Sequence, residues 1–399
     1  MLIRLFLRFS NFLFIIIMLL SSTKAQDKDF KKDSPVRNDS IYQTSGVDNN
    51  LPVFYKNISD RLTFPLSWLS GNYNNFSEWR KIARSKVKEN LLYNPPAVPF
   101  NPVIIGEEDR GTYVARRIVL NISTDSRVLS YLLVPKGEGP FPAMLLLHDH
   151  GGRFDIGKEK MVRPFNVTNK IILSSQEWVD ENYGGEYVGD ELAKRGYICF
   201  ITDAFNWGDR GGGGYEGQQS LSSVFLNLGA SFAGIIAYED MRAAEFLSMQ
   251  PDIDTSKIGA IGWSMGAFRT WQIAAMSEHI KAGVAICWMS SIKELIVPGN
   301  NMIRGYSAYS MIHPNIFNFL DYPDIAGIAC PKPMFFINGL NDHLFPINSV
   351  EHAYQKMKRI WKSQDAETSL YTKLWDTNHT FNLDMQKAAF LWLEENLLK

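Results

Sequence analysis

The chain has 399 residues, a formal net charge of −1 at pH 7, and a composition of 45% hydrophobic, 13% aromatic and 21% charged residues. This length suffices for one large hydrophobic core with additional segments, and the composition excludes a fibrous or wholly disordered protein. The sequence has no basic stripe, so it indicates no nucleic-acid partner.

The first 25 residues are typical of a secretory signal peptide. Arg4 and Arg8 precede an apolar run over residues 12–20, and Thr23 and Ala25 occupy positions −3 and −1 of a small-residue cleavage pattern. The run is short for a membrane span, which needs about 20 residues. We therefore predict an exported protein, periplasmic or secreted, with no stable membrane span after signal cleavage. An uncleaved membrane anchor is the alternative.

The three cysteines, Cys199, Cys287 and Cys330, each stand in or beside an apolar run. This setting is typical of buried free thiols that pack as small hydrophobic residues, although one disulfide stays possible in an exported protein. The sequence has no Cys-x-x-Cys pair that would indicate a metal or redox site.

Composition divides the rest of the chain into three parts. Residues 26–50 are polar and charged and are predicted to form a disordered leader. Residues 51–111 are predicted to be an N-terminal helical extension, because Trp79 and Ala83 lie at helical spacing in it. Residues 112–399 are predicted to be a single catalytic domain.

Strand and helix patterns alternate along this domain. Strands are expected at residues 113–122, 127–134, 141–147, 197–202, 257–262, 282–288, 334–337 and 370–375. Helices are expected at residues 186–195, 221–249 and 267–276, around residues 350–357, and around residues 385–392. This alternation predicts an α/β fold with a mostly parallel central sheet flanked by helices. Residues 289–330 lack the alternation and are predicted to form a lid-like insertion before the strand that begins at residue 334.

Gly262-Trp263-Ser264-Met265-Gly266 matches the pattern G-x-S-x-G. The motif follows a predicted strand and opens a predicted helix, which is the context of a nucleophile elbow. A strained turn there would expose the Ser264 hydroxyl, and the helix N-terminus would point amide groups at the site.

A serine hydroxyl needs a base and an acid in this kind of site, and the chain order of such sites is serine, acid, histidine. The candidate histidines are His148, His150, His279, His313, His343, His352 and His379. His379 fits best because it lies between the last strand and the last helix. Asp342 fits as the acid because it follows the strand at residues 334–337, whereas Asp324 comes too early and Asp376 lies on another loop.

An oxyanion hole should complete the site. The loop after the strand at residues 141–147 and the residue after the nucleophile supply its amides in this architecture. We therefore predict the backbone amides of His150 and Met265, with Gly151 as the alternative to His150. The sequence offers no third ligand beside His148 and His150, so no metal or other cofactor is predicted.

Trp207 and Arg210 follow the strand at residues 197–202 and are predicted substrate contacts, with Trp207 a candidate for stacking on a sugar. The glycine run at residues 211–214 lacks the Lys-Ser/Thr of a phosphate-binding loop, so it predicts a mobile loop and not a nucleotide site.

The motifs of this chain stand at residues 148–152, 203–210 and 262–266, together with Asp342 and His379. With these motifs, residues 75–399 resemble the dienelactone hydrolase and acetyl xylan esterase group of α/β-hydrolases. The resemblance implies a Ser-His-Asp esterase that needs no cofactor and acts on a small-molecule or carbohydrate ester, often as a carbohydrate deacetylase in exported members. The chain departs from the group's common His-Gly pattern by having Asp149 after His148.

Two other functions stay open from the sequence. One is a serine peptidase of the prolyl-oligopeptidase type, although the chain lacks the large N-terminal domain usual there. The other is a non-catalytic binding protein on the same scaffold. The acyl group, the alcohol and the oligomeric state are not indicated by the sequence.

Overall fold

The computed structural model describes residues 51–297 and 299–398. The predicted signal peptide and disordered leader lie outside the described residues. The chain divides into two units, and the second, residues 54–399, contains the sheet and the helices discussed here. Within the described residues, no single helix is long and apolar enough to span a membrane, and one pair of helices passes that test together only across a 90° bend.

A nine-stranded sheet runs through this unit in the order β1-β2-β3-β5-β4-β6-β7-β8-β9. The strands are β1 (Val103–Asp109), β2 (Tyr113–Asn121), β3 (Arg127–Pro135), β4 (Phe141–Leu147), β5 (Ile198–Thr202), β6 (Ile253–Trp263), β7 (Ala282–Ile286), β8 (Met334–Gly339) and β9 (Leu370–Trp375). Strands β1, β2, β3 and β5 pair antiparallel, and the pairs from β5 through β4 to β9 are parallel. The mostly parallel sheet predicted from the sequence is confirmed.

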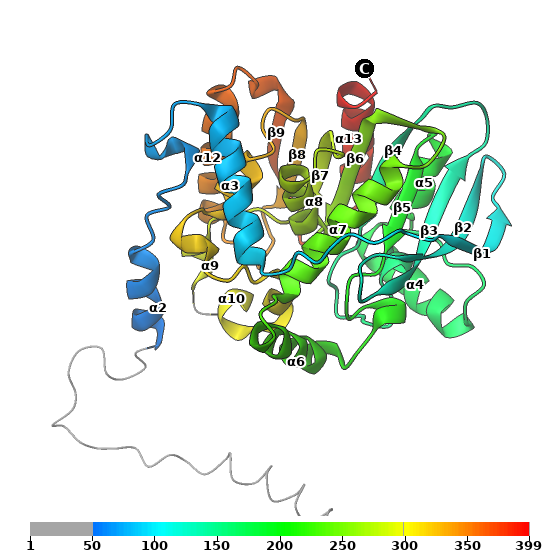
Figure 1. Cartoon of the computed structure of the whole chain (residues 1–399), viewed down its shortest axis with the longest axis horizontal. Coiled ribbons are helices and arrows are strands. Elements are labelled where there is room, and N and C mark those ends of the chain that lie inside the picture. Colours follow the sequence, from blue (N-terminus) through cyan, green and yellow to red (C-terminus); the bar gives the residue numbers. More distant parts are fainter. Residues whose placement is uncertain (1–50, 298, 399) are drawn as a thin grey trace, which may run out of the picture. The chain divides into compact units, whose positions relative to one another are not determined.

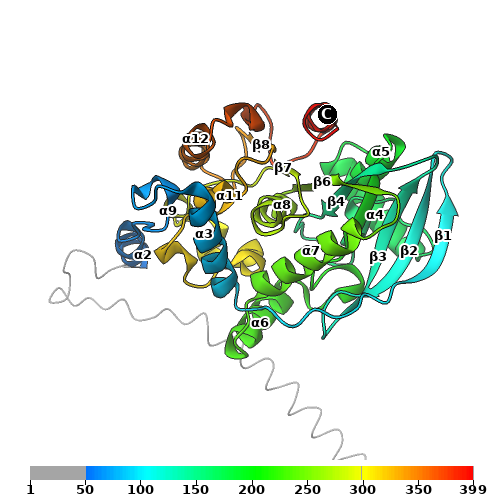
Figure 2. The same ribbon diagram turned by 45° about the horizontal axis from the view of Figure 1, so that its top comes forward.

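Helices cover both faces of the sheet (Figures 1 and 2). The helices of the described residues are α2 (Leu51–Asp60), α3 (Phe76–Leu91), α4 (Asn169–Asn182), α5 (Val188–Lys194), α6 (Gly214–Asn227), α7 (Phe232–Ser248), α8 (Met265–Met276), α9 (Ile292–Leu295), α10 (Asn301–Arg304), α11 (Tyr322–Gly327), α12 (Ile347–Lys362) and α13 (Leu383–Asn396). Short 3-10 turns join several of them, including η3 (Lys158–Lys160), η4 (Gly208–Arg210) and η5 (Tyr306–Met311).

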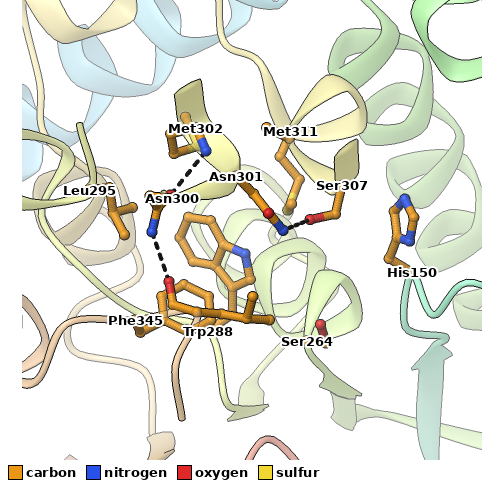
Figure 3. A pocket seen from close by; sticks show the side chains of 12 residues that line it. His150, Ser264, Trp288, Leu295, Asn300, Asn301, Met302, Ser307, Met311 and Phe345 are labelled. Carbon is orange, nitrogen blue, oxygen red and sulfur yellow. Dashed lines mark hydrogen bonds between the residues drawn. The ribbon is translucent and has the colours of Figure 1, made fainter. Parts of the chain in front are cut away.

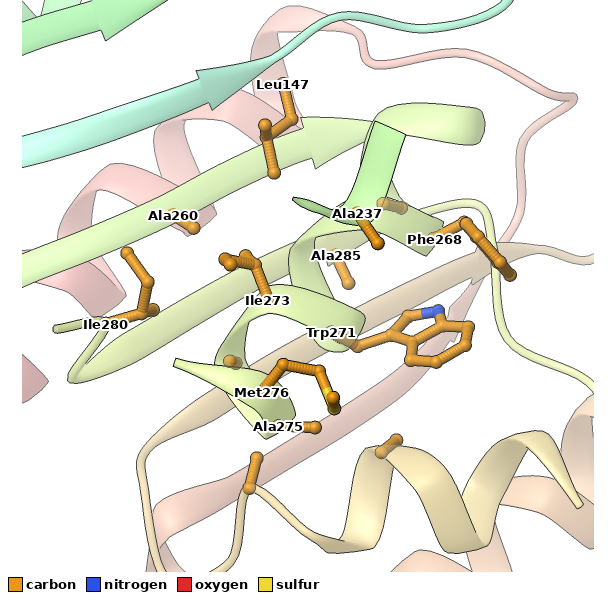
Figure 4. Packing of buried hydrophobic residues seen from close by; sticks show 14 of the residues in the cluster. Leu147, Ala237, Ala260, Phe268, Trp271, Ile273, Ala275, Met276, Ile280 and Ala285 are labelled. Carbon is orange, nitrogen blue, oxygen red and sulfur yellow. The ribbon is translucent and has the colours of Figure 1, made fainter. Parts of the chain in front are cut away.

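Successive residues of the central strands enter two hydrophobic cores, because side chains alternate across a sheet. Leu145 and Leu147 of β4 join one core with residues of α3, α7, α8, α11 and α12. Met144 and Leu146 join the other, with residues of α4, α5 and α13. Figure 4 shows the first core, in which Trp271 of α8 packs over the strands. A strand that is buried on both faces appears in the sequence as a continuous apolar run. This pattern is the reason that the central strands could be predicted.

Two boundaries differ from the sequence prediction. Residues 103–109, placed in the N-terminal extension, form edge strand β1 of the main sheet. Its side chains are mostly exposed, and after three apolar residues it continues with Gly-Glu-Glu-Asp, so it lacks the continuous apolar run of a core strand. The single helix predicted at residues 221–249 is two helices, α6 and α7. The break contains Gly229 at φ +78° and Ser231, whose hydroxyl caps α7.

Residues 289–330, the predicted insertion, connect β7 to β8 through α9, α10, α11 and short 3-10 turns. Helix α11 begins with a capping box in which Asp321 and Asp324 satisfy each other's backbone amides. The carboxylate of Asp321 also accepts from the Ile292 amide at 2.9 Å, which joins the two ends of the insertion.

Candidate active site

Ser264 lies on the sharp turn between β6 and α8. Its backbone has φ +56° and ψ −124°, a conformation that non-glycine residues rarely adopt and that is maintained only by surrounding structure. The Ser264 amide donates to the Ile286 carbonyl of β7 at 2.8 Å, which fixes the turn to the sheet. The strained strand-to-helix turn predicted from the G-x-S-x-G motif is therefore present.

The two glycines of the motif are required by backbone contacts. A Cβ atom on Gly266 would lie 1.9 Å from the Leu147 carbonyl oxygen, and one on Gly262 would lie 2.3 Å from the Gly266 carbonyl carbon. Both distances are far below van der Waals contact, so any side chain would force the elbow away from β4.

His379 and Asp342 meet Ser264 from the next loops along the sheet edge. The Nε2 atom of His379 lies 2.8 Å from Ser264 Oγ, and its Nδ1 lies 2.6 Å from Asp342 Oδ2. The Asp342 side chain is fully buried and that of His379 is 20% exposed. Because a carboxylate only accepts, Nδ1 carries the proton and Nε2 is free to accept the serine proton.

The loops that carry the acid and the histidine are tied together by their backbones. The Leu340 amide donates to the Trp375 carbonyl at 2.7 Å, and the Asn341 amide donates to the Thr377 carbonyl at 3.0 Å. Gly339 permits this approach, because a Cβ there would lie 2.4 Å from the Thr377 carbonyl oxygen. The sequence pattern gave no sign of this pairing between loops.

Other histidine and aspartate candidates for the base and the acid have different hydrogen-bond partners. His313 Nε2 bonds to Gln272, and burial lowers the pKa of His313 to about 4. Asp324 accepts from Ser67 at 2.6 Å and pairs with Lys356. Asp376 accepts from Asn341 at 3.0 Å.

Cys287 stands beside the histidine and the acid. Among the described residues, the potential ligand atoms of Cys287, Asp342 and His379 lie within 4.8 Å of one another. Burial raises the pKa of the Cys287 thiol well above its usual range, and Asp342 already accepts from His379. The Cys287 thiol therefore packs beside a histidine–carboxylate pair whose facing atoms are already bonded to each other. All three cysteines are buried free thiols, as predicted.

A small pocket of about 30 Å³ opens over Ser264 (Figure 3). It is lined by His150, Ser264, Trp288, Leu295, Asn300, Asn301, Met302, Ser307, Ala308, Met311, Leu344 and Phe345. Seven of these twelve residues belong to the segment predicted as a lid-like insertion, which thus forms one wall of the pocket. None of the lining side chains is acidic, Lys or Arg, so the pocket suits a neutral ligand.

The loop after β4 holds two neutral histidines. Burial lowers the pKa of His148 well below its usual value and that of His150 to about 4. Nε2 of His148 accepts from the Ala204 amide at 2.9 Å, so its Nδ1 donates to the Asp149 carbonyl at 2.8 Å. His148 is thus bonded to the backbone, while the His150 ring faces the pocket.

Lys160, which the sequence did not single out, lies fully buried behind this loop. Its ammonium donates to the His150 carbonyl at 2.7 Å and to the Asp149 carbonyl at 3.2 Å, and it lies 3.4 Å from Asp149 Oδ2. The Asp149 carboxylate also accepts from Tyr183 at 2.7 Å and from Trp178 at 3.2 Å. No local motif marks such a residue, because its role depends on three segments that meet only in the fold.

These contacts set the direction of the His150 amide. The peptide between Asp149 and His150 is trans, so its N–H points opposite to its C=O. Lys160 and His148 both donate to the Asp149 carbonyl, so the His150 N–H points away from these two side chains. In the described part of the chain, no acceptor forms a hydrogen bond with this N–H. The Met265 amide is the first of α8 and belongs to the N–H groups that have no intrahelical partner.

The structure does not support Trp207 and Arg210 as substrate contacts. Trp207 has no exposed surface, and its indole N–H donates to the His150 carbonyl at 2.7 Å. The guanidinium of Arg210 is paired with the buried Glu239 and also bonds Ser126. Both residues support the loop from within, so neither has a free face for a ligand.

The parallel sheet, the elbow at Ser264 and the relay through His379 to Asp342 define a serine hydrolase of the α/β-hydrolase fold, as the sequence predicted. Residues 54–390 match the model of the Abhydrolase family, and the chain belongs to that family.

Individual relatives agree with this assignment. The Bacillus subtilis protein YtaP, named as a hydrolase, is 25% identical over 273 residues, which are 68% of this chain and 84% of YtaP. A Bacteroides fragilis protein described as an acetyl xylan esterase superposes with a TM-score of 0.66 at 18% identity over 81% of each chain. A glucuronoyl esterase from Solibacter usitatus gives 0.60 at 11% identity over 84% of this chain and 97% of its own. At these identities the two structures show a shared fold.

Proposed function

We propose that the chain is an exported serine esterase that hydrolyses carboxylic esters through an acyl-enzyme, with an acetylated carbohydrate as its substrate. The observation that carries the proposal is the unbroken relay from Ser264 Oγ through His379 to Asp342 beneath an uncharged pocket. The signal-peptide pattern in the first 25 residues supports export.

In the proposed reaction, Ser264 Oγ forms a bond to the ester carbonyl carbon while His379 Nε2 takes the hydroxyl proton. The amides of His150 and Met265 donate to the resulting oxyanion, and Asp342 stabilises the imidazolium. Collapse of this intermediate breaks the bond to the alcohol, which leaves with the proton from His379.

Water then repeats the sequence on the acyl-enzyme. His379 takes a proton from the water, the oxygen adds to the acyl carbon, and breakage of the bond to Ser264 releases the acid. The apolar part of the pocket wall, which includes Trp288, Leu295 and Phe345, suits a neutral acyl group such as acetyl.

The test is hydrolysis of p-nitrophenyl acetate and acetylated xylo-oligosaccharides by the mature protein and its Ser264→Ala variant. We expect turnover by the wild type and its loss in the variant, with unchanged circular dichroism. Turnover of aminoacyl amides in preference to both esters would indicate a peptidase. Absence of turnover and of labelling by a fluorophosphonate would refute the esterase.

Export is tested separately by expressing the full chain and sequencing the N-terminus of the protein recovered outside the cytoplasm. We expect cleavage after Ala25. A full-length chain retained in the cytoplasm would contradict this part of the proposal without affecting the chemistry.

A further inference from the structure

Two tyrosines from distant parts of the sequence meet outside the pocket. Tyr215 lies in the first turn of α6 and Tyr306 begins η5 in the insertion. Their ring centroids are 5.8 Å apart with planes at 90°, and their exposed fractions are 44% and 51%.

The pair adjoins the nucleophile through His150. The Tyr215 ring stacks on the His150 ring at 5.6 Å and 25°, and His150 lines the same pocket as Ser264. Ser307, the residue after Tyr306, also lines that pocket. In Figure 3, Ser264 and Ser307 lie between His150 and the apolar residue Leu295 at the other side of the view. The tyrosines are thus on the His150 side, away from the apolar wall that suits the acyl group.

The backbone holds both rings in place. Each tyrosine follows a glycine with positive φ, Gly214 at +62° and Gly305 at +89°. Tyr306 itself has φ +37°, a conformation that a bulky residue rarely adopts. Such strain is typical of residues whose position serves a function. A Cβ on Gly305 would also lie 2.7 Å from the Tyr309 ring, so the turn before Tyr306 requires glycine.

The exposed groups match the surface of a sugar. Each ring offers an apolar face, and neither hydroxyl has a hydrogen-bond partner within the part of the chain that the structure describes. A tyrosine side chain can make apolar contacts through its ring while its hydroxyl forms hydrogen bonds with water or a ligand. A pyranose has the complementary pattern, with C–H groups on its face and hydroxyls at its rim. A charged ligand finds no opposite charge in the pocket lining.

We propose that Tyr215 and Tyr306 form a carbohydrate-binding site for the alcohol part of the ester, and that this site makes the enzyme selective for sugar esters. The inference rests on the proposed esterase function, because the ester carbonyl must lie at Ser264 while its sugar contacts the tyrosines.

The kinetic test compares kcat/KM for acetylated xylo-oligosaccharides with kcat/KM for p-nitrophenyl acetate in Tyr215→Ala, Tyr306→Ala and the double variant. We expect the ratio of the two constants to fall about tenfold for each tyrosine, as for the loss of one aromatic contact of ~1.4 kcal/mol. Tyr306→Phe should keep most of the ratio, because the ring remains. Phe54→Ala is the matched control, since Phe54 is 56% exposed and meets Tyr55 in a similar edge-on pair.

A binding measurement separates this proposal from the esterase proposal. Titration of Ser264→Ala with unacetylated xylotriose, followed by calorimetry, reports sugar binding without turnover. We expect binding that Tyr215→Ala and Tyr306→Ala each weaken at least fivefold. Esterase activity with no xylotriose binding, or an unchanged kinetic ratio, would overturn the sugar site and leave the esterase intact. Equal loss of both substrates in Tyr215→Ala, restored by Tyr215→Phe, would assign Tyr215 to holding His150 and overturn its role in sugar binding.

Discussion

Replacing Lys160 by methionine tests whether a buried charge positions the His150 amide. Methionine keeps the length and most of the volume of the side chain but removes every donor. The change deletes hydrogen bonds to two carbonyls, at 2.7 and 3.2 Å, and the cation beside Asp149. Since both side chains are fully buried, removing one partner should lower the free energy of unfolding by about 3–5 kcal/mol.

Activity should fall for a different reason. Removal of one oxyanion-hole donor reduces kcat by roughly 10²–10³. In Lys160→Met the His150 amide remains, but the carbonyl of its own peptide, that of Asp149, is bonded only by His148, so we expect a loss of about 10- to 100-fold in kcat with little change in KM. Urea unfolding and p-nitrophenyl acetate kinetics measure the two effects on the same preparation.

The double variant Asp149→Asn, Lys160→Met separates the two roles. It removes the unpaired carboxylate, so most of the stability should return. The kcat should stay low, because the bond from Lys160 to the Asp149 carbonyl, whose peptide carries the His150 amide, is still absent. Recovery of both quantities would show that Lys160 only neutralises Asp149. Wild-type kcat in the single variant would refute the positioning role.

Three further predictions concern the relay, the insertion and the helix packing. Asp342→Asn should reduce kcat by about 10³–10⁴ with little change in KM, because the amide no longer selects the tautomer of His379 that accepts the serine proton; a loss below tenfold would contradict the relay. Burial raises the pKa of Asp321 from 3.8 to about 6, so the folded state binds this proton more tightly than the unfolded chain. The free energy of unfolding should therefore fall by about 2 kcal/mol between pH 4 and pH 7 because of this group, and Asp321→Asn should lack that fall in urea titrations at both pH values. Gly234→Ala should lower stability by about 3 kcal/mol in thermal unfolding, since its Cβ would lie 1.8 Å from the Leu91 carbonyl oxygen, and a change under 1 kcal/mol would show that α3 and α7 move apart freely.

The parts of the site that the sequence predicted are those governed by local rules. The motif around Ser264 specifies its own turn, and the ends of parallel strands meet at one edge of the sheet, so Asp342 and His379 followed from strand positions alone. Strand β9 was predicted with the bounds that the structure has, Leu370–Trp375.

The predictions that were wrong or missing concern features that depend on contacts between distant segments. Trp207 follows a strand end and precedes glycines, which is also how an exposed aromatic would appear in a sequence. Only the fold places it beneath the His150 loop. Strand β1 was missed because only its first three residues are apolar and the rest are Gly, Glu and Asp, so its existence depends on pairing with β2.

The departure from the His-Gly pattern at Asp149 and the burial of Lys160 are one feature. A glycine after His148 would give the loop no side-chain anchor, whereas the Asp149 carboxylate accepts from Tyr183 and Trp178. Its charge in turn lets an ammonium sit behind two peptide carbonyls that would otherwise face an apolar interior. The same packing requires a glycine at position 151, because a Cβ on Gly151 would lie 2.4 Å from the Trp178 ring. The residue that looked irregular in the sequence is therefore the anchor that fixes the direction of the proposed oxyanion amide.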